Sequence, residues 1–206
     1  MVDDTPQPQH RRGRPRSERA HQAILDATAD LLAESGFGGL RLEHVAARAG
    51  VGKATIYRRW ASREELALEL LTTLAWPHLP VADVGDTRAE LLACVLNPIH
   101  ALTQSAFGPV LRALLSEIAS DQTLGERFRA SVVAERRAEV RAVIARGIDR
   151  GDLRPDVDPG LATALLVGPV YFRLVFGGDL DRRLAEEVVA AYLAGAAPSV
   201  ANEDWF

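Results

Sequence analysis

Four side chains that suit contacts with DNA lie close together in the chain: Lys53, Thr55, Tyr57 and Arg58. The hydroxyl and methyl groups of a threonine can contact base edges in the major groove, and an arginine can bond guanine with two nitrogens. Lysine and tyrosine side chains commonly bond to phosphates. We predict that Thr55 contacts base edges and that Tyr57 contacts a phosphate or a base methyl group. Lys53 and Arg58 are expected to bind phosphates, with guanine as a second target for Arg58.

Each of these side chains also has a structural explanation that needs no DNA. Tyr57 could pack between two helices, and Lys53 and Arg58 could be ordinary solvated charges. The elements that hold the four residues bear on which explanation applies.

The segment 41–60 predicts a helix-turn-helix motif. Residues 42–49 and 53–60 each have an apolar face at helical spacing, and Gly50 can take the left-handed conformation that ends a helix. Such a motif presents the first residues of its second helix to the major groove. Ile56 is then expected to face inward, while the four candidate contacts face outward.

Further helices are expected on both sides of this motif. Apolar side chains recur at helical spacing over 17–36. Ser62 and Glu65 can form a capping box that starts another helix, over 62–76. Arg63, in its first turn, is expected to reach the DNA backbone from the side.

The charge is unevenly placed along the chain. Residues 10–63 hold eleven Lys and Arg against five Asp and Glu, whereas residues 64–206 hold thirteen against twenty-one. A basic module can bind phosphates although the whole chain has a net charge of −4. Residues 1–16 are predicted to be a disordered basic arm whose arginines either enter the minor groove or add only nonspecific attraction: Arg12, Arg14 and Arg16.

Helices alone are predicted beyond residue 80. Capping boxes that start at Thr87 and Thr123 mark two helix starts, and no strand-like alternation competes. Pro98 and Pro169 are expected to break or kink their helices. The chain is predicted to be all-α, with about nine helices, of which the last five cover 87–106, 109–120, 124–150, 159–177 and 181–196.

No pattern predicts an enzyme, a cofactor or a metal site. His44, His78 and His100 have no neighbours at the spacing of metal ligands, and no nucleophile motif or phosphate-binding loop occurs. The single cysteine, Cys94, is predicted to be a buried core thiol in a reducing compartment. Without a run of about 18 apolar residues, the protein is expected to be cytoplasmic and to bind no membrane.

Read in order, the residues of the first part of the chain closely resemble the tetracycline-repressor (TetR) family. The resemblance covers about residues 18–78; the rest resembles the family's regulatory half mainly by its number of helices. It implies a DNA-binding domain over 17–78, with its motif at about 41–60, followed by a helical effector-binding and dimerisation domain over 79–206. The residues that carry it are Gly36-Phe37, Val45-Ala46, Ala49-Gly50-Val51, Lys53-Ala54-Thr55-Ile56-Tyr57-Arg58-Arg59-Trp60 and Ser62-Arg63-Glu64-Glu65-Leu66.

The chain departs from the family pattern at two positions in the motif. Arg41 stands where relatives often have a threonine or serine that caps the first helix of the motif, and Gly52 stands where many have a serine. Arg41 could contact a phosphate directly instead.

The resemblance also implies a cavity for a small apolar or amphipathic effector in the second domain. Aromatic residues, with a few polar ones, are the candidates to line it, although each could simply belong to the core. These candidates are Trp76, His78, His100, Phe107, Glu117, Phe128, Tyr171 and Phe172.

The last two predicted helices are rich in Leu, Val and Ala on more than one side. We predict that they pair with the same helices of a second copy in a four-helix interface, the alternative being a monomeric core. The residues expected there are Leu161, Leu165, Val170, Leu174, Leu184, Val188 and Tyr192.

These features predict a sequence-specific transcriptional regulator that binds a near-palindromic operator in double-stranded DNA as a homodimer. The resemblance implies a repressor that a small effector releases. One alternative is a regulator that activates or binds no ligand, and a more distant one is a helical adaptor or enzyme that uses the motif for protein contacts.

Overall fold

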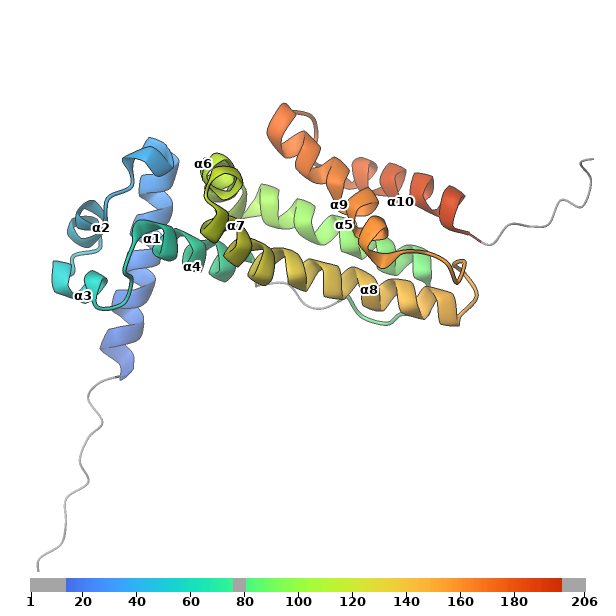
Figure 1. Cartoon of the computed structure of the whole chain (residues 1–206), viewed down its shortest axis with the longest axis horizontal. Helices are drawn as coiled ribbons and strands as arrows, with labels where there is room; N and C mark the ends of the chain where they lie inside the picture. The colour runs from blue at the N-terminus through green and yellow to red at the C-terminus, as the bar shows by residue number, and fades with distance from the viewer. Residues whose placement is uncertain (1–13, 76–80, 198–206) are drawn as a thin grey trace, which may run out of the picture. The chain divides into compact units, whose positions relative to one another are not determined.

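A computed structural model describes residues 14–75 and 81–197, and every regular element in these two ranges is a helix (Figure 1). The prediction of an all-α protein is confirmed. The contacts divide the chain into two compact units, 1–66 and 67–206. Arg12, Trp76 and His78, which were candidates for DNA or effector contacts, lie outside the described residues.

The first unit contains α1 (Arg14–Gly39), α2 (Leu42–Arg48) and α3 (Lys53–Tyr57). The regular part of α1 ends at Gly36, whose φ of 63° leaves the helical region, as predicted. Its start differs from the prediction, because the backbone of residues 14–16 already belongs to α1 and not to an arm. Pro15 fits there because the amides of the first turn of a helix have no partner within the helix.

The core of the first unit consists of side chains that are almost completely buried. Ile56, which was expected to face inward, is 0% exposed, and Trp60 is 1% exposed. Arg48 on α2 forms a two-pronged ion pair with Glu34 on α1, with distances of 2.6 and 2.8 Å. The small helices α2 and α3 are therefore held by a shared core and by α1.

The helix α4 (Arg63–Ala75) leads into the second unit, which contains α5 to α10. The predicted helix at 124–150 consists of α7, a π-helical turn and α8 in direct succession. The bounds are α5 (Thr87–Gln104), α6 (Phe107–Ser120), α7 (Gln122–Phe128), the π-helical turn η1 (Arg129–Val133), α8 (Ala134–Asp149), α9 (Pro159–Phe176) and α10 (Arg182–Ala196).

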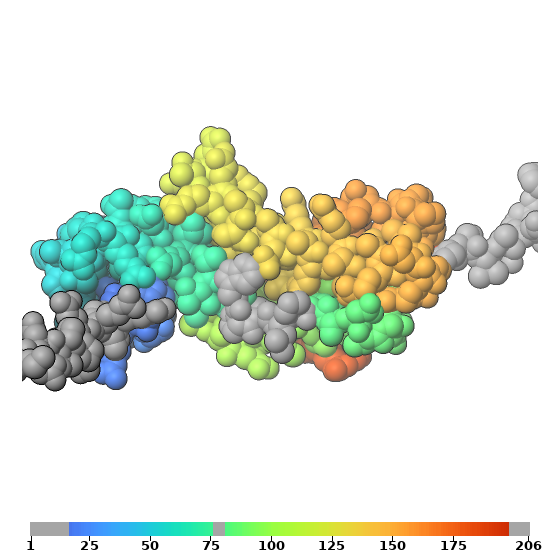
Figure 2. All heavy atoms as spheres, turned by 90° about the horizontal axis from the view of Figure 1, so that it is seen from below, coloured from blue at the N-terminus to red at the C-terminus, as the bar shows by residue number. Residues whose placement is uncertain are grey.

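Helix α5 packs against α8, α9 and α10, and α8 also packs against α9. On the face shown in Figure 2, α8 lies beside the residues that lead into α5. α9 is long and apolar enough to cross a membrane by length and composition, but a third of it is buried within this unit. Pro98 and Pro169 lie inside α5 and α9 without breaking them.

Two predicted capping boxes are wrong, because the aspartate before each helix provides the cap. Asp86 accepts a hydrogen bond from the amide of Ala89, and Asp121 accepts one from that of Leu124. The hydroxyl of Thr87, expected to be a cap, is buried and donates to Asp152, at 2.6 Å. The capping box at Ser62 is confirmed in part: its hydroxyl accepts from the Glu65 amide, at 3.2 Å.

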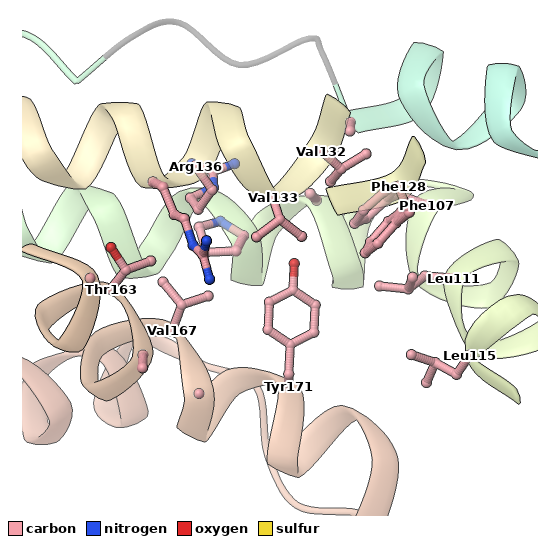
Figure 3. Close-up of a pocket in the computed structure, with 17 residues that line it drawn as sticks. Phe107, Leu111, Leu115, Phe128, Val132, Val133, Arg136, Thr163, Val167 and Tyr171 are labelled. Carbon is pink, nitrogen blue, oxygen red and sulfur yellow. The ribbon is translucent and has the colours of Figure 1, made fainter. Parts of the chain in front are cut away.

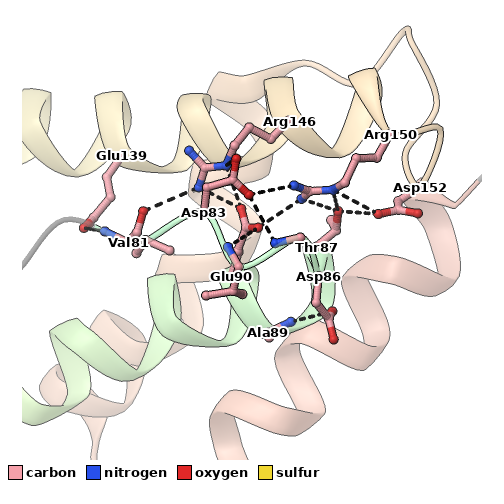
Figure 4. A network of polar contacts seen from close by, with 12 residues as sticks. Val81, Asp83, Asp86, Thr87, Ala89, Glu90, Glu139, Arg146, Arg150 and Asp152 are labelled. Atoms are coloured by element: carbon pink, nitrogen blue, oxygen red, sulfur yellow. Dashed lines mark hydrogen bonds and ion pairs between the residues drawn. The ribbon is translucent and has the colours of Figure 1, made fainter.

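A buried carboxylate joins α5 to the end of α8 (Figure 4). The Glu90 side chain has no exposed surface. One of its oxygens accepts a hydrogen bond from Nε of Arg146, at 2.8 Å, and pairs with Nη2 of the same arginine, at 2.7 Å. The other oxygen accepts a hydrogen bond from the Val84 amide and pairs with Nη2 of Arg150, both at 3.2 Å. Asp83 and Asp152 also pair with Arg150, at 3.2 and 3.4 Å, so two arginines face three carboxylates in this network.

Candidate DNA-binding surface and ligand cavity

The turn between α2 and α3 is a Schellman motif followed by an uncapped helix start. The amide of Val51 donates to the carbonyl of Ala46, and the amide of Gly50 donates to that of Ala47. This motif places Gly50 at a φ of 65°, which only glycine adopts easily. Gly52 has an ordinary extended conformation and gives α3 no side-chain cap, as its lack of a hydroxyl predicts.

Helix α3 presents the predicted contact residues on one side and its core residue on the other. Lys53 and Arg58 are exposed, Thr55 is half-buried, and Tyr57 is 50% exposed, whereas Ile56 is fully buried. An exposed face with two cations and a hydroxyl at the start of a recognition helix suits the major groove. With half of its surface exposed, the Tyr57 side chain is not enclosed between α1 and α3.

A carboxylate that sequence reasoning missed lies beside these residues. The phenol of Tyr57 donates a hydrogen bond of 2.5 Å to Glu43 in the first turn of α2. This bond lowers the pKa of the Glu43 carboxyl below its ordinary value and raises the pKa of the Tyr57 phenol. The position of Glu43 in a first helical turn, where acidic residues are favoured, was the available signal.

Two arginines that were expected to contact phosphates, Arg41 and Arg63, each donate hydrogen bonds to carbonyls at the end of α1. Nη1 of Arg41 donates to the carbonyls of Gly38 and Leu40, at 2.9 and 3.1 Å. Nη1 of Arg63 donates to the carbonyls of Phe37 and Leu40, and its guanidinium lies 4.4 Å from the centre of the Phe37 ring. Carbonyls at a helix end have no partner within the helix, which explains why they hold these guanidinium groups.

The second unit contains a partly open cavity of about 380 Å³ (Figure 3), within the size range of small-ligand sites. It is lined mainly by apolar side chains from α5 to α9. Of the predicted residues, Phe107, Phe128 and Tyr171 line it, and the Tyr171 hydroxyl points into it. The lining residues that sequence reasoning missed include Leu111, Leu115, Val132, Val133, Arg136, Arg137, Thr163 and Val167.

Three other effector candidates do not line this cavity. His100 on α5 is exposed, Glu117 on α6 is half-buried, and Phe172 on α9 is 63% exposed. Phe172 follows Tyr171 directly, so the two side chains point about 100° apart around the helix. Burial of Tyr171 raises the pKa of its phenol.

The segment from α7 through η1 to α8 forms one wall of the cavity. Its lining positions are 128, 132, 133, 136 and 137. Positions 132 and 136, and positions 133 and 137, are each four residues apart, so the two pairs share one side of the segment. Arg136 and Arg137 in α8 both lie on that side.

One face of α9 carries large apolar side chains that nothing in the described unit covers. Their successive spacings are four, seven, three and one residues, which keep them on one side of the helix. Val170, Leu174, Leu184 and Tyr192, which were predicted at a dimer interface, are buried within the chain instead, and Val188 is half-buried. The exposed stripe comprises Leu161, Leu165, Phe172, Val175 and Phe176.

Within the described ranges, no group of three or more His, Cys, Asp and Glu side chains could hold a metal ion. Cys94 is fully buried, as predicted, and burial raises the pKa of its thiol to about 12.

Comparison with known proteins agrees with this architecture. The chain is 35% identical over 171 residues to the uncharacterised helix-turn-helix regulator YdeS of Bacillus subtilis, covering 83% of this chain and 86% of YdeS. It is 29% identical over 182 residues to the DNA-binding transcriptional repressor TetR of Mycobacteroides abscessus, covering 84% and 94% of the two chains. The crystal structure of the TetR family regulator SCO0332 superposes with a TM-score of 0.64 and 31% identity, covering 87% of this chain and 100% of that one.

Two family descriptions cover most of the chain. Residues 24–70 match the bacterial regulatory proteins of the tetR family, and residues 81–192 match the tetracyclin repressor-like C-terminal domain. The chain is therefore a helix-turn-helix transcriptional regulator that belongs to the TetR family.

Proposed function

We propose that this regulator is a repressor, which binds a near-palindromic operator as a homodimer and leaves it when a small molecule occupies the cavity of the second unit. The observation that carries the DNA-binding part is the exposed face of α3, with Lys53, Thr55 and Arg58 on it. We assign base contacts to Thr55 and phosphate contacts to Lys53 and Arg58.

We assign more limited roles to Arg41, Arg63 and Tyr57. The first two hold the turn before α2 in place, and their remaining guanidinium nitrogens can contact phosphates. Tyr57 contacts the DNA backbone through its ring, because Glu43 holds its hydroxyl hydrogen. The arginines at 12, 14 and 16 precede or begin α1, and we assign them nonspecific or minor-groove attraction.

Binding to the DNA that flanks the protein's own gene tests this assignment. Fluorescence anisotropy compares this DNA with an unrelated duplex, for the unmodified protein and for Thr55→Ala. Loss of a base contact lowers affinity for the specific DNA by about tenfold or more and leaves nonspecific affinity almost unchanged. Equal losses on both duplexes would remove Thr55 from the reading face.

Thr123→Ala is the matched control, because Thr123 is exposed on α7 in the second unit. Lys53→Ala provides the contrast to Thr55→Ala. It is expected to weaken binding to both duplexes and to reduce the salt dependence of the affinity by about one phosphate contact.

The proposal of an effector rests on the cavity between α5 and α9. Its size, its apolar lining and the few polar groups that point into it are typical of a ligand site. A ligand releases DNA only if it binds better to the conformation that does not bind the operator.

The proposal of a homodimer rests on the exposed stripe of α9. Single exposed apolar residues are normal on a protein surface, but five large apolar side chains on one helix face form a patch that indicates an interaction site. A second copy related by a two-fold axis would cover the stripe with the same residues and would match a near-palindromic operator. Because such a regulator must reach the DNA, we assign it to the cytoplasm. We assign it no enzymatic role.

A further inference from the structure

The cavity of the second unit is apolar except for an excess of positive charge. Seventeen of the described residues line it; Arg136 and Arg137 are the only charged ones among these seventeen, which include no aspartate or glutamate. A guanidinium beside an apolar cavity loses hydration and gains stability from an anion.

The ion pairs that these two arginines form with described residues do not cancel the positive charge of the cavity. Arg136 donates to Glu139, and its side chain is only 18% exposed. The same Glu139 carboxylate also accepts a bond from the Val81 amide, at 3.3 Å. One carboxylate therefore balances one of the two arginines, and the exposed Arg137 has no carboxylate partner among the described residues.

The polar and apolar groups lie at different ends of the cavity (Figure 3). Arg136 and Thr163 lie together where α8 faces α9, whereas Phe107, Phe128 and Leu115 lie at the end formed by α6 and α7. The Tyr171 hydroxyl points into the space between them and stays protonated, so it can donate a hydrogen bond.

We propose that the ligand of this cavity is an amphipathic anion. Its acidic head group binds Arg136, Arg137 and the Tyr171 hydroxyl, and its apolar body lies between Phe107 and Phe128. This inference rests on the proposed function, in which the cavity holds the effector. A neutral ligand would leave one of the two positive charges without a counter-ion, and a cation would be repelled.

Three probes with one apolar chain and different head groups test the charge. Decanoate, decanamide and decylammonium are titrated into the full-length protein by calorimetry, at concentrations below micelle formation. Decanoate is expected to bind about tenfold or more tightly than decanamide, since a charge-assisted hydrogen bond strengthens binding by that factor. Decylammonium is expected to bind most weakly.

Substitution of the arginines tests the site. Arg136→Met and Arg137→Met, singly and together, remove the charge with little change in length, and the double variant is expected to bind decanoate no better than decanamide. Retained decanamide binding shows that the cavity is intact. Arg136→Met with Glu139→Gln removes the pair together, so that no buried carboxylate is left without its partner.

Arg141→Met is the matched control, because Arg141 is exposed on the same helix and does not line the cavity. Arg136→Lys is expected to keep a reduced preference for decanoate, since a lysine keeps the charge but not the two-pronged geometry.

The outcomes separate this inference from the proposed function. Equal binding of decanoate and decanamide, or a decanoate preference that survives the double substitution, overturns the assignment of an anion and leaves an apolar effector site standing. If none of the three probes binds the protein, the inference and the effector proposal both fail, while operator binding stands on its own test.

Discussion

The phenol of Tyr57 on α3 donates a 2.5 Å hydrogen bond to the carboxylate of Glu43 on α2, and this bond joins the two helices of the DNA-binding motif. It also places a negative charge close enough to Lys53 for the two to attract each other. Glu43 thus stabilises the motif while it opposes the approach of phosphates.

Glu43→Gln is expected to increase DNA affinity at low salt by about twofold to fivefold, because a single exposed charge has an effect of that size. The gain should disappear as salt rises, and it should be equal on specific and nonspecific DNA. Fluorescence anisotropy at two salt concentrations, on specific and nonspecific DNA, measures the gain in affinity and its salt dependence. Glu135→Gln, at an exposed position on α8, is the control; unchanged affinity in Glu43→Gln would show that the carboxylate lies away from the DNA.

Removal of the buried carboxylate of Glu90 is expected to destabilise the second unit strongly. Glu90→Ala leaves Arg146 and Arg150 without their shared partner in a partly buried site, with an expected loss of roughly 3 to 5 kcal/mol in the free energy of unfolding. Urea denaturation measures this loss. Glu187→Ala breaks the exposed ion pair with Arg183 and should leave the free energy of unfolding almost unchanged. Similar losses in both variants would contradict a special role for Glu90.

The helices could be predicted from the sequence because apolar spacing and the residues that end helices are local signals. The caps were harder, since Asp86 and Thr87 are adjacent and either can cap a helix. The choice depends on Asp152, which accepts a bond from Thr87 across 65 positions of the chain. No local pattern contains that contact.

The recognition helix was predictable for the same local reason, whereas the cavity was not. Arg136 and Arg137 resemble solvated charges in the sequence, and no local pattern indicates that both line the cavity. α9 is apolar on two sides, so the sequence did not distinguish the buried Val170 from the exposed Phe172. Burial of a helix face depends on what packs against it.

Tyr192→Phe is expected to stabilise the protein. The Tyr192 hydroxyl is buried and has no hydrogen-bond partner among the described residues, and burial raises the pKa of the phenol. Replacing a buried unpaired hydroxyl with hydrogen recovers roughly 1 kcal/mol or more of desolvation free energy. Thermal unfolding measures the change. A lower melting temperature for Tyr192→Phe would mean that a second copy provides the missing partner.

The thiol of Cys94 is expected to resist alkylation in the folded protein. Its pKa is raised from 9.0 to about 12, chiefly by burial, so below pH 9 it holds on the order of a thousandfold less thiolate than an unfolded chain. Because the folded pKa is the higher one, the associated stability is complete below pH 9 and falls as pH rises toward 12. Iodoacetamide labelling at pH 8, with and without urea, measures this protection; rapid labelling of the folded protein would contradict the burial.

A charge in the exposed stripe of α9 is expected to dissociate the homodimer. Leu165→Glu and Phe172→Glu place a carboxylate where side chains that are 52% and 63% exposed would meet a second copy. Burying an unpaired carboxylate costs several kcal/mol, so either variant should raise the dimer dissociation constant by at least about a hundredfold. Analytical ultracentrifugation measures this constant, and Ala142→Glu on the exposed side of α8 is the control. Operator affinity should fall together with the dimer, because one recognition helix alone reads too few bases. A dimer that persists in both variants would place the interface on another face.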